Sequence, residues 1–188
     1  MCNRKIILMK KKYFILFTIF FVNLAQAQVK YLTKEGFVSF FSHSLVEDIK
    51  ADNHQVLSII DTETGEIAIQ LLMKSFQFKK ALMQEHFNEN YIESHKFPKA
   101  KFKGEIQNFD QLTDQINEVE IKGVLSVHGE EKEVNTKAVV EIRENEILVS
   151  GDFMVEVADF NIKIPSVVIN NIAKTIKVSF KLNQKPYK

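Results

Sequence analysis

The chain has 188 residues but only one cysteine, Cys2, and no tryptophan. The scarcity of cysteine excludes a disulfide framework and a cysteine-ligated zinc site. No serine stands in a Gly-x-Ser-x-Gly arrangement, so the sequence lacks the nucleophile elbow of many hydrolases. A domain without cross-links must be held together by its core, and a chain of this size can bury roughly 70% of its unfolded surface.

The apolar run at residues 13–24 is too short to span a bilayer, whose hydrocarbon core takes about 20 apolar residues. Five basic residues precede this run, and the small-residue sequence Ala-Gln-Ala ends at Ala27. This layout is typical of a secretory signal peptide. We therefore expect residues 1–27 to be removed, Cys2 with them, and the mature protein to be periplasmic or secreted. The alternative, an uncleaved membrane anchor, is disfavoured by the length of the run.

The expected mature chain, residues 28–188, carries 20 basic and 24 acidic residues, a net charge of −4. Affinity for nucleic acid depends on Lys and Arg side chains that neutralise phosphates, and the mature chain has no basic cluster. Nucleic acid is therefore not an expected partner. The length fits one domain.

Apolar and polar residues alternate along eight stretches, which is the period of a half-buried β-strand. Turn residues separate several of them, for example at residues 63–65 and 128–131. The stretches with the clearest alternation are 117–127, 134–143, 147–156 and 176–182, and those with weaker alternation are 37–42, 55–61, 67–73 and 100–109.

Eight strands with mostly short connections predict an all-β fold built on one antiparallel sheet, which removes its edges if it closes into a barrel. An eight-stranded barrel is just wide enough to be filled with side chains or to hold one small ligand. Residues 79–94 interrupt the pattern with good helix formers, so we expect a short helix to close or rim one end. Residues 158–173, broken by Pro165, are expected to be irregular.

Two histidines, His86 and His95, lie in this helical stretch or just after it. Their spacing differs from the i, i+4 pair of a zincin helix, so we expect no metal site. Glu85, Glu89 and Glu93 recur every four residues and would share one helical face. Paired carboxylates can hydrolyse glycosides, but such a face is more often simply solvated, and we interpret it so.

Gly123 and Gly151 interrupt the apolar faces of two predicted strands, where a missing side chain leaves room. This room is either filled by neighbouring phenylalanines or available to an apolar ligand. Protein interiors are normally close-packed, so the pattern alone favours a packed core.

Three motifs resemble those of a known family. The first is a His-containing helical stretch that runs into Lys-Phe-Pro-Lys-Ala-Lys-Phe, the second is a Gly-Val-Leu-Ser-Val-His-Gly hairpin followed by a lysine, and the third is Asp-Phe-Asn-Ile. Together they resemble the YceI-like lipid/polyisoprenoid-binding family. These motifs occupy residues 83–102, 123–132 and 159–162.

The resemblance extends from Gly36 to the last strand. It implies an exported, lipocalin-like antiparallel barrel that holds a long apolar chain, such as a polyisoprenoid, and it implies neither enzyme activity nor a cofactor. With it, a hollow interior becomes the favoured reading. Many relatives carry His-Leu-Gly after the first long strand, where this chain has Ser-His-Ser-Leu-Val at residues 42–46. This departure concerns polar contacts to a ligand head group and does not affect the barrel.

The predicted site follows from the alternation and the resemblance. Phe87 and Tyr91 are expected to rim the cavity, while His86 and Asn90 either orient a head group or cap the turn. For each lining residue, ordinary core packing is the alternative. The residues expected to line the interior are Val38, Phe40, Phe102, Leu125, Val140, Val149, Phe153 and Phe180.

Two other functions remain open at this stage. A solid barrel would serve as an interaction module through its surface loops, since a fold does not fix a function. An enzyme acting on a bound lipid is the third hypothesis, although no catalytic constellation stands out in the sequence.

Overall fold

The computed structural model describes residues 30–44, 47–165 and 172–187. The predicted signal peptide lies outside these ranges. Strands dominate the described chain, with short helical turns between some of them. The strands are β1 (Lys30–Ser42), β2 (Ile49–Asp61), β3 (Glu66–Leu72), β4 (Gln77–Phe78), β5 (Lys99–Ile106), β6 (Ile116–Val127), β7 (Glu130–Arg143), β8 (Glu146–Glu156) and β9 (Thr175–Tyr187).

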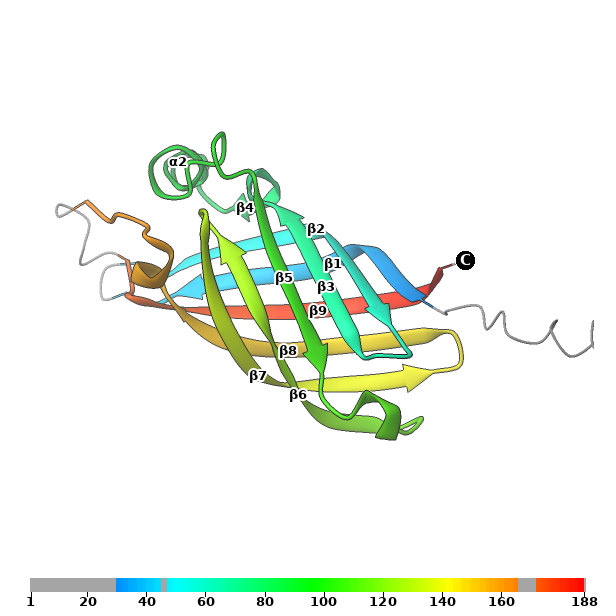
Figure 1. The fold of residues 1–188 in the computed structure, drawn as a ribbon. Coiled ribbons are helices and arrows are strands. Elements are labelled where there is room, and N and C mark those ends of the chain that lie inside the picture. Colours follow the sequence, from blue (N-terminus) through cyan, green and yellow to red (C-terminus); the bar gives the residue numbers. More distant parts are fainter. Residues whose placement is uncertain (1–29, 45–46, 166–171, 188) are drawn as a thin grey trace, which may run out of the picture.

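Eight strands form a closed antiparallel barrel in the order β1-β9-β8-β7-β6-β5-β3-β2, and β1 closes the ring by pairing with β2 as well as with β9 (Figure 1). The two-residue β4 pairs with β2 alone among the described strands and is not part of the ring. The predicted eight-stranded barrel is therefore confirmed.

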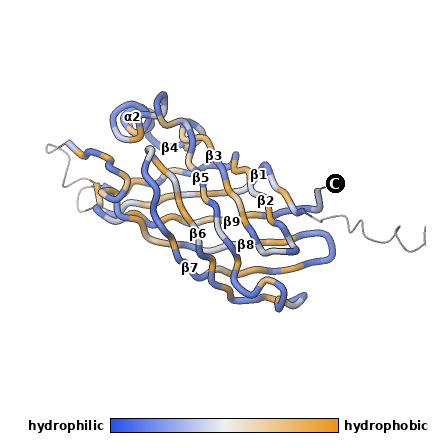
Figure 2. Tube along the Cα trace, in the orientation of Figure 1, coloured by the Kyte–Doolittle hydropathy of each residue, from blue (hydrophilic) through white to orange (hydrophobic). Residues whose placement is uncertain are grey.

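The barrel forms because side chains on each strand alternate between an apolar interior and solvent. Hydrophobic and hydrophilic residues accordingly alternate along the strands in Figure 2. On β6, for example, Val119 and Ile121 are buried, whereas Glu118, Glu120 and Lys122 are exposed. In a closed ring the inward faces of all eight strands meet in one interior.

The two ends of the barrel differ. At one end the connections are the tight turns at residues 62–65 and 144–145 and the loop at 107–115, which includes η3 (Phe109–Gln111). We call this the turn end. At the other, the helical end, lie the short β6–β7 turn, the β1–β2 connection and two long connections, which include η1 (Met73–Ser75), β4, α2 (Ala81–His86), η2 (Phe87–Tyr91) and η4 (Val157–Phe160) (Figure 1).

A short helix at one end was predicted, and α2 with the π-helical turn η2 confirms it. We call residues 81–92, which comprise α2, η2 and the residue after them, the helical segment. Lys80 precedes it in an extended conformation, and Glu93 follows it with a positive φ of 46°. The described part of residues 158–173 is irregular apart from η4, as expected.

The core at the turn end is tightly packed. Neighbouring strands place Val149 opposite both Val140 and Leu182, so these three side chains form one layer. A buried polar pair lies beside them, where Gln184 Nε2 donates to Ser58 Oγ at 2.6 Å. The hydrophobic side chains with no exposed surface are Val56, Ile60, Ile106, Val140, Val149 and Leu182.

The structure extends two of the weaker predicted strands and shortens a third. β1 begins at Lys30, seven residues before the predicted start at Phe37. The pattern missed this first part because two register irregularities around Gly36 break the alternation there. β2 begins at Ile49 rather than at Gln55. The alternation of apolar and polar residues did not reveal its first part, because polar residues such as Asn53 stand there at buried positions. β5 ends at Ile106, because Asn108 adopts a left-handed conformation with φ of 56° and turns the chain away.

The packed layer predicts a large stability loss for Leu182→Ala, because the fully buried leucine leaves a void that its neighbours cannot close. We expect the free energy of unfolding to fall by about 2–5 kcal/mol in a urea titration. Leu57→Ala, on an outward-facing position of β2, is the matched control and should cost clearly less. Equal losses for the two variants would contradict a packed turn end.

Candidate ligand-binding site

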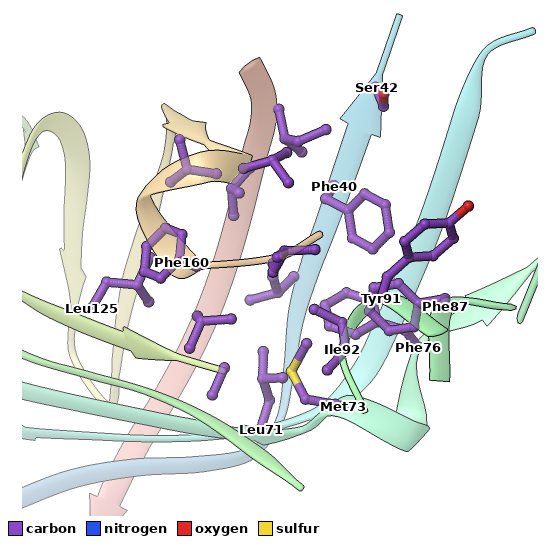
Figure 3. Close-up of a pocket in the computed structure, with 18 of the residues that line it drawn as sticks. Phe40, Ser42, Leu71, Met73, Phe76, Phe87, Tyr91, Ile92, Leu125 and Phe160 are labelled. Carbon is purple, nitrogen blue, oxygen red and sulfur yellow. The ribbon is translucent and has the colours of Figure 1, made fainter. Parts of the chain in front are cut away.

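A cavity of about 380 Å³ occupies the helical end of the barrel interior (Figure 3). All eight ring strands contribute to its wall, and the helical segment covers it with Met83, Phe87, Tyr91 and Ile92. Side chains from η4 and the segment after it, including Phe160, complete the wall. The volume lies within the range of small-molecule sites, about 300–1,000 Å³.

Four phenylalanines attach the helical segment to the barrel, and all four border the cavity. The ring of Phe87 stacks on Phe40 of β1 at 5.4 Å between centroids, and lies 5.8 Å from Phe76 and 5.0 Å from Phe78. Phe40 also contacts Phe76 and Phe78 edge-on, at 5.3 and 5.7 Å. Aromatic pairs at these separations add about 0.5–1.5 kcal/mol beyond area burial. The helical segment is therefore docked on the barrel by apolar contacts.

Of the two alternatives that the sequence left open for the inward glycines, the structure shows the first, because neighbouring phenylalanines fill the room that they leave. Gly104 of β5 lies opposite Gly123 of β6, and the ring of Phe102 lies over both. A Cβ atom at Gly123 would lie 2.6 Å from Phe102 Cζ and 2.5 Å from the carbonyl oxygen of Lys103. The ring of Phe180 covers Gly151 in the same way. The glycines thus leave room for aromatic rings to lie against the sheet.

His128 ties three segments of the helical end together. Its Nδ1 donates to the carbonyl oxygen of Phe160 at 2.9 Å, and its Nε2 lies 3.5 Å from Glu93 Oε2. The imidazole packs on Phe97 with the ring centroids 4.4 Å apart. Lys96 also bonds to Glu93, and this bond lowers the pKa of the Glu93 carboxyl below its ordinary value, with a smaller contribution from His128. These contacts hold the β6–β7 hairpin against the segment that follows η2.

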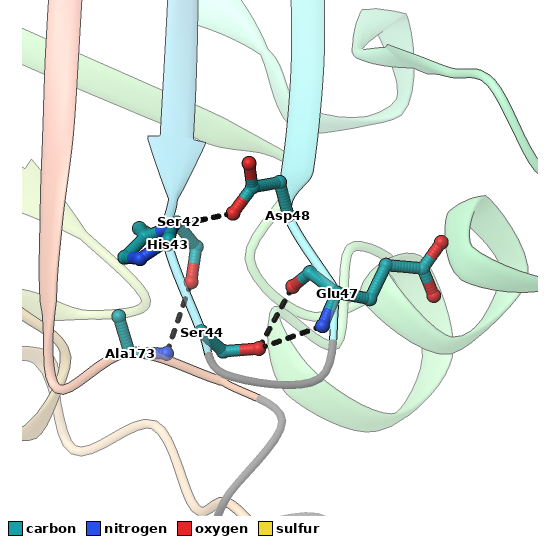
Figure 4. A network of polar contacts seen from close by, with 6 residues as sticks. All are labelled: Ser42, His43, Ser44, Glu47, Asp48 and Ala173. Carbon is teal, nitrogen blue, oxygen red and sulfur yellow. Dashed lines mark hydrogen bonds and ion pairs between the residues drawn. The ribbon is translucent and has the colours of Figure 1, made fainter.

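The β1–β2 connection carries a polar network at the rim of the cavity (Figure 4). Ser44 Oγ donates to the carbonyl oxygen of Glu47 at 2.8 Å and accepts from its N–H at 3.1 Å. The Glu47 carboxylate pairs with Lys80, just before α2, and His43 pairs with Asp48 at 2.6 Å. The network therefore links the connection to the start of the helix.

Most of the predicted lining residues border the cavity. Val140 and Val149 do not, because they lie in the packed layer of the turn end. Asn90 is exposed on η2 and does not border the cavity either. Alternation predicted which way Val140 and Val149 point but not how deep the cavity reaches. Those that border the cavity are Val38, Phe40, His86, Phe87, Tyr91, Phe102, Leu125, Phe153 and Phe180, and their part in binding stays a prediction.

Sequence reasoning missed several wall residues. Phe76 and Phe78 lie around β4, a two-residue strand too short to show alternation, and the Phe-x-Phe pattern ahead of the helix was the available signal. Ser42, at the end of β1, also borders the cavity, although a serine at a strand end carries no distinctive pattern.

Within residues 30–44, 47–165 and 172–187, no group of three or more His, Cys, Asp or Glu side chains is arranged to hold a metal ion. His86 and His95 are both exposed. Over the same residues, no helix combines the length and hydropathy that crossing a bilayer requires.

Comparison with known proteins gives a family match over most of the chain. The model of the YceI-like domain family matches residues 26–184. The comparison with curated proteins gives no match.

Several solved structures share the fold. A polyisoprenoid-binding domain from Saccharophagus degradans, implicated in plant cell wall breakdown, superposes with a TM-score of 0.73 at 16% identity, covering 85% of this chain and 99% of that one. BcnA from Burkholderia cenocepacia gives 0.67 at 15% identity, with 79% and 95% covered. The YCEI protein of Campylobacter jejuni gives 0.61 at 12% identity, with 78% and 89% covered. At these identities the likeness concerns the fold.

The packing of Phe102 on two glycines predicts that Gly123→Ala destabilises the barrel. The added methyl group has to displace either the Phe102 ring or the β5 backbone, and overpacking of this kind costs about 1–3 kcal/mol. The free energy of unfolding in urea measures the loss, with Val124→Ala on the outer face of β6 as the control. A stability equal to that of the parent protein would show that the ring moves aside freely.

Proposed function

The chain belongs to the YceI-like domain family, and we propose that it is a non-enzymatic carrier that holds one long apolar chain, a polyisoprenoid or another lipid, inside its barrel. The observation that carries the proposal is the cavity of about 380 Å³ with an almost entirely apolar wall. A structural neighbour described as a polyisoprenoid-binding domain supports the choice of ligand class.

The hydrophobic effect alone is enough for useful affinity. Each methylene group moved from water into an apolar environment contributes about 0.8 kcal/mol. A chain that buries about ten such groups gains on the order of 8 kcal/mol, which corresponds to micromolar binding before the costs of association are subtracted. Few polar contacts are therefore needed.

The open cavity also weighs against the solid-barrel alternative, which requires a filled interior. At the helical end the wall consists of side chains with space between them, whereas the turn end of the same barrel is close-packed. Interiors normally fill such space. A cavity at one end of a barrel whose other end is close-packed therefore favours a bound ligand over a solid barrel.

Export is part of the proposal and rests on the layout of residues 1–27. We expect the intact mass of the exported protein to correspond to a chain that begins at Gln28. Because Cys2 is removed with the leader, a reductant should leave the melting temperature unchanged. A mass that retains residues 1–27, or a melting temperature lowered by reductant, would count against export by this route.

The carrier proposal predicts a co-purifying apolar molecule, detected by native mass spectrometry and identified after solvent extraction. Leu125→Trp adds volume to the cavity wall and should lower the ligand occupancy at least severalfold. The matched control is Val124→Trp, the adjacent residue on β6, whose side chain faces outward.

Occupancy that is equal in the two folded tryptophan variants would place the ligand outside the barrel. A barrel that binds no apolar molecule, either from the cell or added in solution, would refute the carrier proposal itself.

A further inference from the structure

We propose that the helical end of the cavity recognises an uncharged oxygen acceptor on the ligand, such as a ketone, ester or alcohol, through the hydroxyl groups of Ser42 and Tyr91. This inference rests on the proposed lipid binding and adds the chemical class of the head group.

Polar side chains of the cavity wall are unevenly distributed. Thr136 lies on the inward face of β7, and its hydroxyl donates to the carbonyl oxygen of Asp152 at 2.9 Å, so it is already satisfied. Lys101 alternates with the inward-facing Ala100 and Phe102, which places its ammonium group on the outer face. The remaining polar side chains, Ser42, Glu47, His86 and Tyr91, come from the helical end.

Ser42 has an unused donor. Its side chain is 1% exposed, and its Oγ accepts a hydrogen bond from the N–H of Ala173 at 3.0 Å (Figure 4). Among the described residues, the Ser42 hydroxyl donates no hydrogen bond. A buried donor without a partner costs about 1–3 kcal/mol, so a ligand oxygen in contact with Ser42 recovers that energy.

Tyr91 supplies a second donor. Its ring borders the cavity on η2, and its hydroxyl makes no hydrogen bond to any residue that the structure describes. In Figure 3 the hydroxyl groups of Ser42 and Tyr91 lie on the Phe40 side of the pocket, away from Leu71 and Leu125. A ligand whose apolar chain lies between Leu71 and Leu125 thus brings its head group to these two donors.

The charges at the rim favour an uncharged head group. The ammonium group of Lys80 pairs with Glu47, and His43 pairs with Asp48, so neither side chain is free to pair with an anionic head group. Glu47 also borders the cavity, and its carboxylate offers no positive charge to an anionic head group. Since Glu47 is engaged by Lys80, an ammonium head group also finds no free partner there. His86 is exposed, where water competes for its ring nitrogens.

The test measures selectivity with one hydrocarbon and three chain-matched amphiphiles. Diphenylhexatriene, a fluorescent hydrocarbon without acceptor atoms, is titrated directly, and 2-dodecanone, dodecanoate and dodecylamine are titrated as competitors. We expect 2-dodecanone to bind the parent protein more tightly than the two charged compounds. In Tyr91→Phe and Ser42→Ala, the affinity for 2-dodecanone relative to diphenylhexatriene should fall about three- to tenfold, which is the worth of one hydrogen bond.

Tyr31→Phe is the matched control, because Tyr31 packs against the core without bordering the cavity, and its selectivity should equal that of the parent protein. Tyr91→Phe keeps the test decisive if Ser42→Ala fails to fold. Tighter binding of dodecanoate or dodecylamine than of 2-dodecanone, or an unchanged ratio in both variants, would overturn the inference and leave lipid binding intact. A parent protein that binds none of the four compounds would overturn the proposed function as well.

Discussion

The rest of the structure depends on the closure of the barrel, in which β1 pairs with β9 on one side and with β2 on the other. Closure joins the first and last strands of the described chain, so every ring strand pairs with two neighbours. It also forces the inward faces of eight strands into one interior of limited width. The irregularities around Gly36 let β1 bend while it serves both neighbours.

Within that single interior, the two ends play different parts. The turn end is filled by aliphatic side chains without exposed surface, and in our account this packing is the main source of stability. The helical end is spanned by a segment docked through the contacts of Phe87 with Phe40, Phe76 and Phe78, which leaves space beneath it. A cavity forfeits packing energy in proportion to its size, so a stable protein can carry one only where the rest of the core compensates.

The strand pattern allowed much of this to be predicted, because alternation depends on residue type alone. It identified eight strands and the inward direction of residues such as Phe153, and the motifs identified the family. It did not separate Val149, which is packed, from Phe153, which borders the cavity, since depth depends on how the strands tilt and where the loops fold back. For the same reason the pattern could not decide what fills the room at Gly123, because the ring that covers Gly123 belongs to a neighbouring strand. Local pattern could not indicate the contact of Ser42 with Ala173 either, because the two residues lie far apart in the sequence.

The central claim, that the helical end of the interior receives an apolar chain, is tested most directly by methyl NMR spectra of the ligand-free protein titrated with a saturated-chain lipid. The account predicts shifts for methyl groups of the cavity wall, such as those of Leu71 and Ile69, with little change for Leu182 and Val149 in the packed layer. Shifts confined to outward-facing methyl groups, such as those of Leu57 and Val139, would contradict it.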